Sequence, residues 1–197
     1  MSALSRRQVR REDRWTLWNW RNSERVRLMS MNDNPIPRED HDSWFTKTFP
    51  TMRDRMVIVE WAGRSVGWYQ IESWEESSRS GEWGNAIGEP EATPIGLGGG
   101  LPLLALSHAF DRMQAVQMIG RVLTLNRNMN AIMRRLKVPV DEDLAAVVRR
   151  MDGSESSVTA YRVDRPTWPR IEATGLSLLP SSLRQSFVQC LSEPISE

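Results

Sequence analysis

The feature that most constrains this chain is a glycine-rich segment, residues 96–100, directly before an apolar stretch. In that stretch, residues 101–113, apolar side chains recur at helical spacing, which predicts a buried helix. Glycines permit positive φ and leave backbone amides uncovered by side chains. The first turn of a helix also carries unpaired N–H groups and a partial positive charge. Together these features predict a cradle for a phosphate or pyrophosphate group.

Two common phosphate-binding motifs do not fit the glycine-rich segment. No Lys-Ser or Lys-Thr pair follows the glycines, which excludes a P-loop. The G-x-G-x-x-G pattern with a later acidic residue is also absent, which argues against a dinucleotide fold. Taken alone, the segment favours a flexible connector over an anion site, so its interpretation depends on the rest of the chain.

The remaining segments predict a mixed α/β domain. The order begins with a weak strand and then alternates helices with hairpins, one of them turning at Asp152-Gly153, which indicates a mixed sheet. The predicted strands are residues 56–61, 66–71, 82–87, 116–125, 144–148 and 158–163, and the predicted helices are residues 11–28, 37–50, 101–113 and 128–136. Residues 1–165 are predicted to form the domain. Residues 166–197, rich in Pro and Ser, are predicted to be a tail with a short helix near 183–191.

Composition excludes several classes of protein. The 197 residues suit one domain, and a formal net charge of +1 supplies no broad footprint for nucleic acid. One cysteine and two histidines argue against a disulfide framework and against a metal site. The first residues lack the apolar run of a signal peptide, and no stretch approaches the roughly 20 apolar residues of a membrane helix. We therefore expect a cytoplasmic protein with no membrane partner.

Two motifs around the glycines resemble the GNAT acyltransferase superfamily. The family's loop reads Arg/Gln-x-x-Gly-x-Gly/Ala after the fourth strand, and here Thr93-Pro94-Ile95-Gly96-Leu97-Gly98 occupies that place. The family's Asn-x-x-Ala-Ile/Leu motif follows the fifth strand and matches Asn128-Met129-Asn130-Ala131-Ile132. One helix and one strand separate the two motifs, as in the family.

The N-terminal half resembles one GNAT subgroup, which includes the UDP-amino-sugar N-acetyltransferases of the pseudaminic-acid pathway. The similar segments are Trp20-Arg21-Asn22-Ser23-Glu24-Arg25-Val26-Arg27, Asn32-Asp33, Glu39-Asp40-His41 with Trp44-Phe45, and Glu82-Trp83-Gly84. The resemblance covers roughly residues 5–164. It implies the GNAT fold: a mixed, mostly antiparallel sheet of about seven strands, splayed between strands 4 and 5, with flanking helices.

The same resemblance implies an N-acyltransferase that uses acetyl-CoA or another acyl thioester as co-substrate. An acyl group would pass directly to the amine of a small molecule, with a nucleotide-linked amino sugar as the first candidate. Amides near Ala86, Ile87 and Gly88 would hold the acyl carbonyl and stabilise its oxyanion. The residues implied for the CoA thioester are Ala86, Ile87, Gly88, Ile95, Gly96, Leu97, Gly98, Gly99, Gly100 and Asn128.

Each candidate catalytic or acceptor-binding residue also has a purely structural interpretation. Glu82 is a candidate general base or a solvated strand charge. The acceptor-binding candidates are Arg21, Asn22, His41 and Trp44, which are otherwise a helix surface, a cap and packing residues. Arg135 stands where many GNAT members have a Tyr that protonates the leaving thiolate. Arginine cannot act as that acid at neutral pH, although its charge can stabilise a thiolate.

Thr93 replaces the usual Arg or Gln of the loop, and this leaves two alternatives open. One is an acyltransferase whose donor is an acyl-carrier protein. The other is a degenerate GNAT domain used for binding or assembly, with the Trp-rich N-terminal half as its interface. A homodimer is compatible with all three functions.

Overall fold

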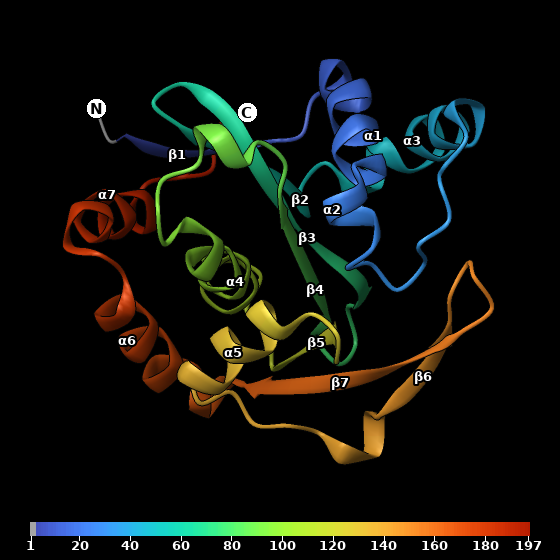
Figure 1. Ribbon diagram of the computed structural model, residues 1–197. Helices are drawn as coiled ribbons and strands as arrows, with labels where there is room; N and C mark the ends of the chain where they lie inside the picture. Colours follow the sequence, from blue (N-terminus) through green and yellow to red (C-terminus); the bar gives the residue numbers. More distant parts are fainter. Residues whose placement is uncertain (1–2) are drawn as a thin grey trace.

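A single seven-stranded sheet runs through the computed structural model, which describes residues 3–197 (Figure 1). Its spatial order is β1-β2-β3-β4-β5-β7-β6, and every neighbouring pair is antiparallel except β4 and β5, which are parallel. The strands are β1 (Leu4–Gln8), β2 (Met56–Trp61), β3 (Arg64–Glu75), β4 (Ser80–Ile87), β5 (Gln117–Leu123), β6 (Ala146–Arg149) and β7 (Glu155–Asp164).

The sheet splits between β4 and β5. These strands pair only where Ser80–Trp83 faces Gln117–Gly120. Beyond that point β4 continues to Ile87 and β5 to Leu123 without pairing to each other. The predicted mixed sheet with a splay between its fourth and fifth strands is therefore confirmed.

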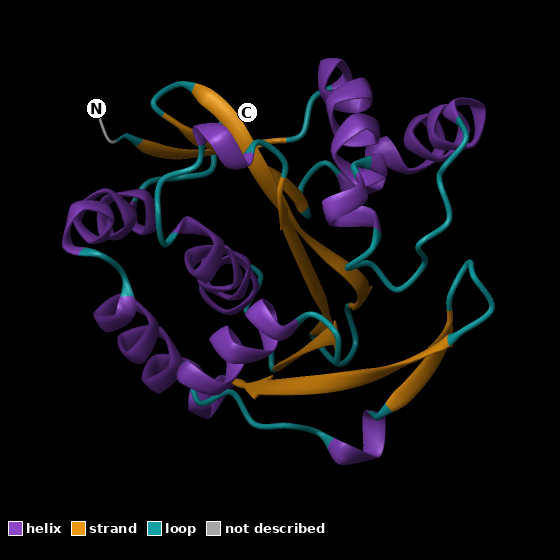
Figure 2. Ribbon diagram, in the orientation of Figure 1, coloured by secondary structure: helices purple, strands orange, loops and turns teal. Residues whose placement is uncertain are grey.

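Helices cover both faces of the sheet (Figure 2). They are α1 (Arg14–Asn22), α2 (Glu24–Arg27), α3 (Arg38–Met52), α4 (Leu97–Ser107), α5 (Arg127–Arg135), α6 (Trp168–Leu178) and α7 (Ser181–Ser192). Alternate residues of β2 point to opposite faces: Met56 and Ile58 pack with α1–α3, whereas Val57 and Val59 pack with α4, α6 and α7. No helix within residues 3–197 is long and apolar enough to cross a membrane.

Helix α4 is central because its side chains are apolar on every side. Leu101, Leu104 and Leu106 are fully buried, as expected for a helix enclosed by sheet and helices. The α-helix begins at Leu97, within the glycine-rich segment, and ends at Ser107. A π-helical turn, His108–Arg112, completes the segment predicted as helix.

The helix predicted over residues 11–28 is two helices in the structure. Ser23 interrupts it with extended backbone (φ −56°, ψ 135°), and its hydroxyl donates to the carbonyl of Trp20 at 2.7 Å. A serine that bonds nearby backbone competes with helix continuation. The break turns the chain so that α2 and the residues after it approach β4.

The C-terminal segment forms more structure than the predicted short helix. That helix lies within α7, and α6 was not predicted. Trp168, Ile171 and Phe187 are buried in the same core as α4. A Cβ on Gly100 would lie 2.6 Å from Cε2 of Phe187, so this glycine permits the close contact between α4 and α7. The boundary at residue 165 stays a prediction.

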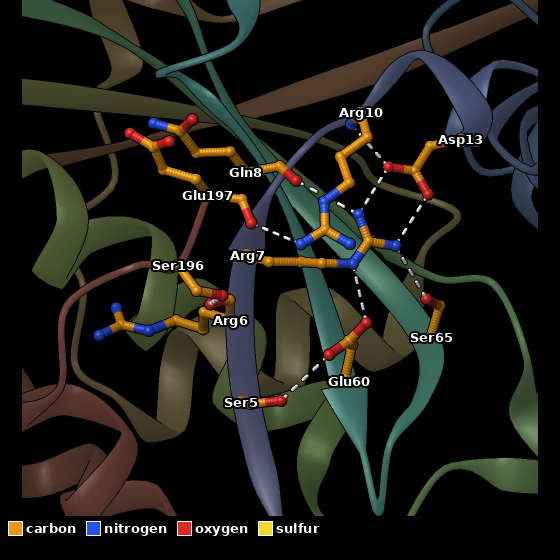
Figure 3. Close-up of polar contacts among 10 residues, drawn as sticks. All are labelled: Ser5, Arg6, Arg7, Gln8, Arg10, Asp13, Glu60, Ser65, Ser196 and Glu197. Carbon is orange, nitrogen blue, oxygen red and sulfur yellow. Dashed lines mark hydrogen bonds and ion pairs between the residues drawn. The ribbon is translucent and has the colours of Figure 1, made fainter.

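The last residues protect the outer edge of β1 (Figure 3). Gln8 N donates to Ser196 O at 2.8 Å, and Ser196 N donates to Arg6 O at 3.1 Å. Beside this edge, Arg7 forms ion pairs with Asp13 at 2.6 Å and Glu60 at 2.8 Å. Pairing of an edge strand with the chain's own terminus removes a site for edge-to-edge association.

Candidate active site

A cavity of about 820 Å³ opens where β4 and β5 separate. Its wall combines β4 and β5 with the first turns of α4 and α5, one face of β3, and the segment that follows α2. This volume suits a small-molecule ligand. The predicted glycine-rich segment thus lies at a loop-to-helix junction that borders the open wedge of the sheet.

The unpaired end of β4 offers backbone amides to the cavity. Gly88 N donates to Val66 O at 2.8 Å, so antiparallel alternation directs the backbone groups of Asn85 and Ile87 toward the gap. The carbonyl of Ile87 accepts from Arg25 Nη2 at 2.5 Å. Two N–H groups, those of Asn85 and Ile87, therefore face the wedge. Of the predicted acyl-binding residues, Ala86 and Ile87 line the cavity and Gly88 does not.

Gly98 is the member of the glycine-rich segment that reaches the cavity. Leu97 N donates to Pro94 O at 3.2 Å, and the amides of Gly99 and Gly100 donate to Gly96 O at 3.0 and 3.2 Å. Among the described residues, the amide of Gly98 has no backbone acceptor. It is a free donor at the N-terminus of α4, where an anion is stabilised.

The other predicted members of this segment have structural roles or lie outside the lining. Gly96 adopts φ +94° and precedes α4. Leu97 is buried in the core, whereas Ile95 is 90% exposed outside the cavity lining. A Cβ on Gly99 would meet nothing within 4 Å. The loop therefore combines packing glycines with one position that faces the ligand space.

The first turn of α5 forms another part of the wall. Asn128 lines the cavity, as does Asn126, whose side chain caps the helix by accepting from Met129 N at 3.1 Å. Asn126 was not predicted as a site residue, although an Asn three residues before an apolar helical position is a capping signal. Arg135, near the other end of α5, is exposed and lies outside the lining.

Two carboxylates, Glu72 and Glu82, face each other across β3 and β4 in the cavity wall. Glu82 accepts from Nε of Arg121 at 3.0 and 3.2 Å. Among the described residues, no basic group lies within ion-pair distance of Glu72. Surrounding protein atoms, and secondarily the charge of Glu82, raise the pKa of Glu72, although its side chain still reaches solvent. Glu72 was missed because the strand was predicted to end at residue 71.

The structure separates the four predicted acceptor-binding residues. Arg21 lines the cavity and donates to Asn32 O at 2.6 Å. Asn22 bonds both backbone groups of Ile36, at 3.1 and 2.7 Å, and so fixes the chain before α3.

His41 and Trp44 are on α3, outside the cavity lining. His41 is buried, its Nε2 lies 2.8 Å from Arg14 O, and burial lowers its pKa. Trp44 is largely exposed beside it, with ring centroids 5.4 Å apart. Within residues 3–197 there is no group of three or more His, Cys, Asp and Glu side chains able to hold a metal ion.

Solved structures share this fold at low sequence identity. The spermidine N-acetyltransferase from Vibrio cholerae in complex with CoA and spermine has a TM-score of 0.72 and 17% identity, over 85% of this chain and 98% of that one. A dodecameric structure of the Vibrio cholerae enzyme has a TM-score of 0.68 and 19% identity, over 84% and 96% of the two chains. The Salmonella typhimurium protein yncA with its cofactor acetyl-CoA has a TM-score of 0.64 and 16% identity, over 83% and 94%.

Homologous structures thus contain CoA or acetyl-CoA, and the similarity does not single out amino-sugar enzymes. A comparison with curated proteins finds no match for the chain. The family model of the acetyltransferase (GNAT) domain matches residues 4–139, which is more than half of the sequence. The chain therefore belongs to the GNAT family and is an N-acetyltransferase.

Proposed function

We propose that this N-acetyltransferase transfers the acetyl group of acetyl-CoA to the amine of a small molecule that also carries an anionic group. The observation that supports both halves of this proposal is the cavity itself. Its wall combines free backbone donors of β4 and α4 with four arginines, Arg21, Arg25, Arg121 and Arg127, and only two glutamates.

Backbone donors explain binding of the thioester. The amide of Gly98, aimed by α4, would bind the pyrophosphate, and the amides of Asn85 and Ile87 would bind the acyl oxygen. Asn128 would contact the pantetheine arm. When bound, acetyl-CoA supplies the acyl group and a thiolate leaving group. Direct transfer needs no covalent enzyme intermediate, and Cys190, a buried residue of α7, is not required.

Glu72 is the carboxylate better suited to accept the proton of the attacking amine. Glu82 is held by Arg121, whose Nε donates to both of its carboxylate oxygens. Glu72 has no such ion pair and its pKa is raised, which brings it closer to the working range of a general base. We assign no catalytic role to Arg135, because it lies outside the cavity wall.

The excess of arginine favours an acceptor with a phosphate or carboxylate, such as a nucleotide-linked amino sugar. A polyamine, like the spermine of the Vibrio cholerae complex, is the second candidate because that structure has the same fold. Several ammonium groups beside four arginines would repel one another, which places the polyamine second.

The acceptor proposal is tested by thiol release from acetyl-CoA with matched amines. Glucosamine and glucosamine 6-phosphate differ only in the anion, and spermine and a UDP-linked 4-amino sugar represent the two acceptor classes. We expect the phosphate to raise kcat/KM at least about tenfold over glucosamine, because the arginines bind it. The Arg21→Met variant should reduce that ratio, whereas the Arg149→Met variant, altered at an exposed residue outside the cavity lining, should retain it.

The remaining functions predict different results from the same assay. A higher kcat/KM for spermine than for either anionic amine would overturn the anionic acceptor. Transfer from an acyl-carrier protein but not from acetyl-CoA would favour the carrier-protein donor. Saturable acetyl-CoA binding without turnover of a broad amine panel would favour the binding module. Location in the cytoplasm and a homodimer stay predictions.

A further inference from the structure

Residues 28–32, which follow α2, all line the cavity. No helix or strand includes these residues. Backbone bonds hold their first part against α2, since Leu28 N donates to Glu24 O at 2.9 Å and Ser30 N to Arg27 O at 3.0 Å, and side chains bind their carbonyls. Arg21 donates to Asn32 O at 2.6 Å, and Arg27 donates to Asp33 O at 2.6 Å. Both arginines come from the neighbouring helices α1 and α2. We refer to residues 28–32 as the acceptor wall.

A third arginine reaches the acceptor wall from a distant part of the sequence. Arg150 follows β6, and its guanidinium donates to Ser30 O at 2.7 Å and to Leu28 O at 2.8 Å. The same guanidinium forms an ion pair with Asp33 at 3.2 Å. The Arg150 and Asp33 side chains are only 6% and 9% exposed. The backbone of Met151 adds a bond from its N–H to Oδ1 of Asp33 at 2.8 Å.

The turn that carries Arg150 is shaped by its own short-range bonds. Gly153 adopts φ +83°, a conformation that glycine tolerates without strain. Asp152 accepts from the N–H and the hydroxyl of Ser154 at 2.9 and 2.6 Å. Arg150 N also donates to Ser154 O at 2.8 Å. The hairpin therefore presents Arg150 from a turn with a defined conformation.

The contact between Arg150 and the acceptor wall connects the two halves of the split sheet. The acceptor wall follows α1 and α2, which pack on the β1–β4 half. The turn of Arg150 extends β6 and β7, which belong to the β5 half. Figure 1 shows this turn reaching beyond the sheet toward the segment between α2 and α3. Since β4 and β5 do not pair beside the cavity, Arg150 and Asp33 bridge the halves at a second place.

We propose that Arg150 and Asp33 are positioning residues that fix the acceptor wall and thereby control binding of the acceptor amine. This inference rests on the proposed function, because it assigns residues 28–32 to the acceptor side. A buried ion pair contributes little to stability over an apolar pair, but it can specify one conformation. Here the specified conformation includes two backbone carbonyls of the wall, which an apolar residue at position 150 could not bind.

Three variants separate positioning from a general loss of folding. Arg150→Met removes the charge and the bonds that the guanidinium donates, and it leaves Asp33 buried without its cation. Asp33→Asn with Arg150→Met removes both charges and so avoids that cost. Arg150→Lys retains the charge but loses the fork that reaches two carbonyls. The matched control is Arg149→Met, which makes the same change at an exposed neighbour.

Three readouts test the proposal. With glucosamine 6-phosphate as acceptor, we expect the double variant and Arg150→Lys to raise KM about tenfold and to change kcat less than about threefold, since acceptor binding is weakened. The dissociation constant for acetyl-CoA, from calorimetry, should stay within about twofold of wild type because the thioester side is untouched. Hydrogen exchange at the amides of residues 28–33 should become at least about tenfold faster.

The hydrogen-exchange readout does not depend on the acceptor. If the wild-type enzyme acetylates none of the panel amines, the proposed acceptor class fails, whereas the exchange measurement still tests the positioning role. If Arg150→Met does not fold, Arg150→Lys and the double variant carry the test. Exchange rates and acceptor KM equal to those of Arg149→Met in both variants would overturn the proposal. An equal weakening of acetyl-CoA binding would also overturn it.

Discussion

The two ends of the cavity are built in different ways. At the thioester end, the candidate donors are backbone amides of Asn85, Ile87 and Gly98, presented by a strand edge and a helix terminus. At the proposed acceptor end, the wall consists of side chains and of residues 28–32, which Arg21 of the neighbouring α1 and the distant Arg150 hold in place. One end thus depends on the course of the backbone and the other on the identity of particular side chains.

This difference explains why proteins of low sequence identity can share a binding site for the same co-substrate. Structures with only 16–17% identity that contain CoA or acetyl-CoA have TM-scores of 0.64 to 0.72 with this chain. Amides recur wherever the backbone recurs, so a binding site for a shared co-substrate tolerates extensive sequence change. A wall made of side chains does not, which is why fold similarity carries no acceptor with it.

The largest effect is expected from a substitution at Gly98, which should disrupt acetyl-CoA binding at the thioester end. Gly98→Glu places a carboxylate beside the free amide, in space where the nearest atom to a Cβ is 3.9 Å away. Repulsion of the pyrophosphate should weaken acetyl-CoA binding at least about 100-fold by calorimetry. Gly98→Ala, which adds no charge, should weaken it less than about threefold. Wild-type affinity in Gly98→Glu would remove the glycine-rich segment from the site.

The next effect distinguishes the two carboxylates. Glu72→Gln should lower kcat about 100-fold as expected for loss of a general base, and the acidic limb of the rate–pH profile should disappear. Glu82→Gln should cost less, because Arg121 already holds that carboxylate. A larger loss in Glu82→Gln, with the acidic limb retained in Glu72→Gln, would reverse the assignment.

A smaller effect separates the packing glycine from the one that faces the ligand. Gly100→Ala would place its Cβ 2.6 Å from the Phe187 ring and should lower the free energy of unfolding by about 2 kcal/mol. Gly99→Ala meets nothing within 4 Å and should be neutral or raise it by up to about 1 kcal/mol. Urea unfolding of both variants measures the difference, and equal stabilities would contradict the contact between α4 and α7.

The smallest effect concerns a buried histidine, His108, in the π-helical turn that follows α4. Burial, and after it the charges of Arg6 and Arg112, lower the pKa of His108 to about 4. The folded protein therefore binds this proton only well below the pH at which the unfolded chain does, so stability falls as pH drops below about 6.5.

From pH 7.5 to 6, this group should reduce the unfolding free energy by about 1 kcal/mol. His108→Met should flatten the dependence of stability on pH by that amount in urea titrations. An unchanged slope in the variant would show that His108 does not titrate in this way.

The sequence predicted most of the secondary structure, and four of the residues that it proposed for the thioester, Ala86, Ile87, Gly98 and Asn128, line the cavity. Hydrophobic periodicity placed α4 and the strands β2, β4 and β5, because their burial patterns repeat along the chain itself. It placed β3 less well, since the strand continues past residue 71 through a bulge, and this hid Glu72. His41 and Trp44 show the opposite limit, because their motif marks α3 while the structure places both residues outside the cavity lining.

The chain by itself determined the glycine-to-helix junction, the strands around it and thus the membership of the family, because these depend on local conformation and on the order of elements. Only the tertiary structure decided which amides stay free, which carboxylate has an ion pair, and which residues meet at the acceptor wall. Arg150 and Ser30 are 120 positions apart in the sequence. No periodicity predicts such a contact, since it exists only after the two halves of the split sheet have come together.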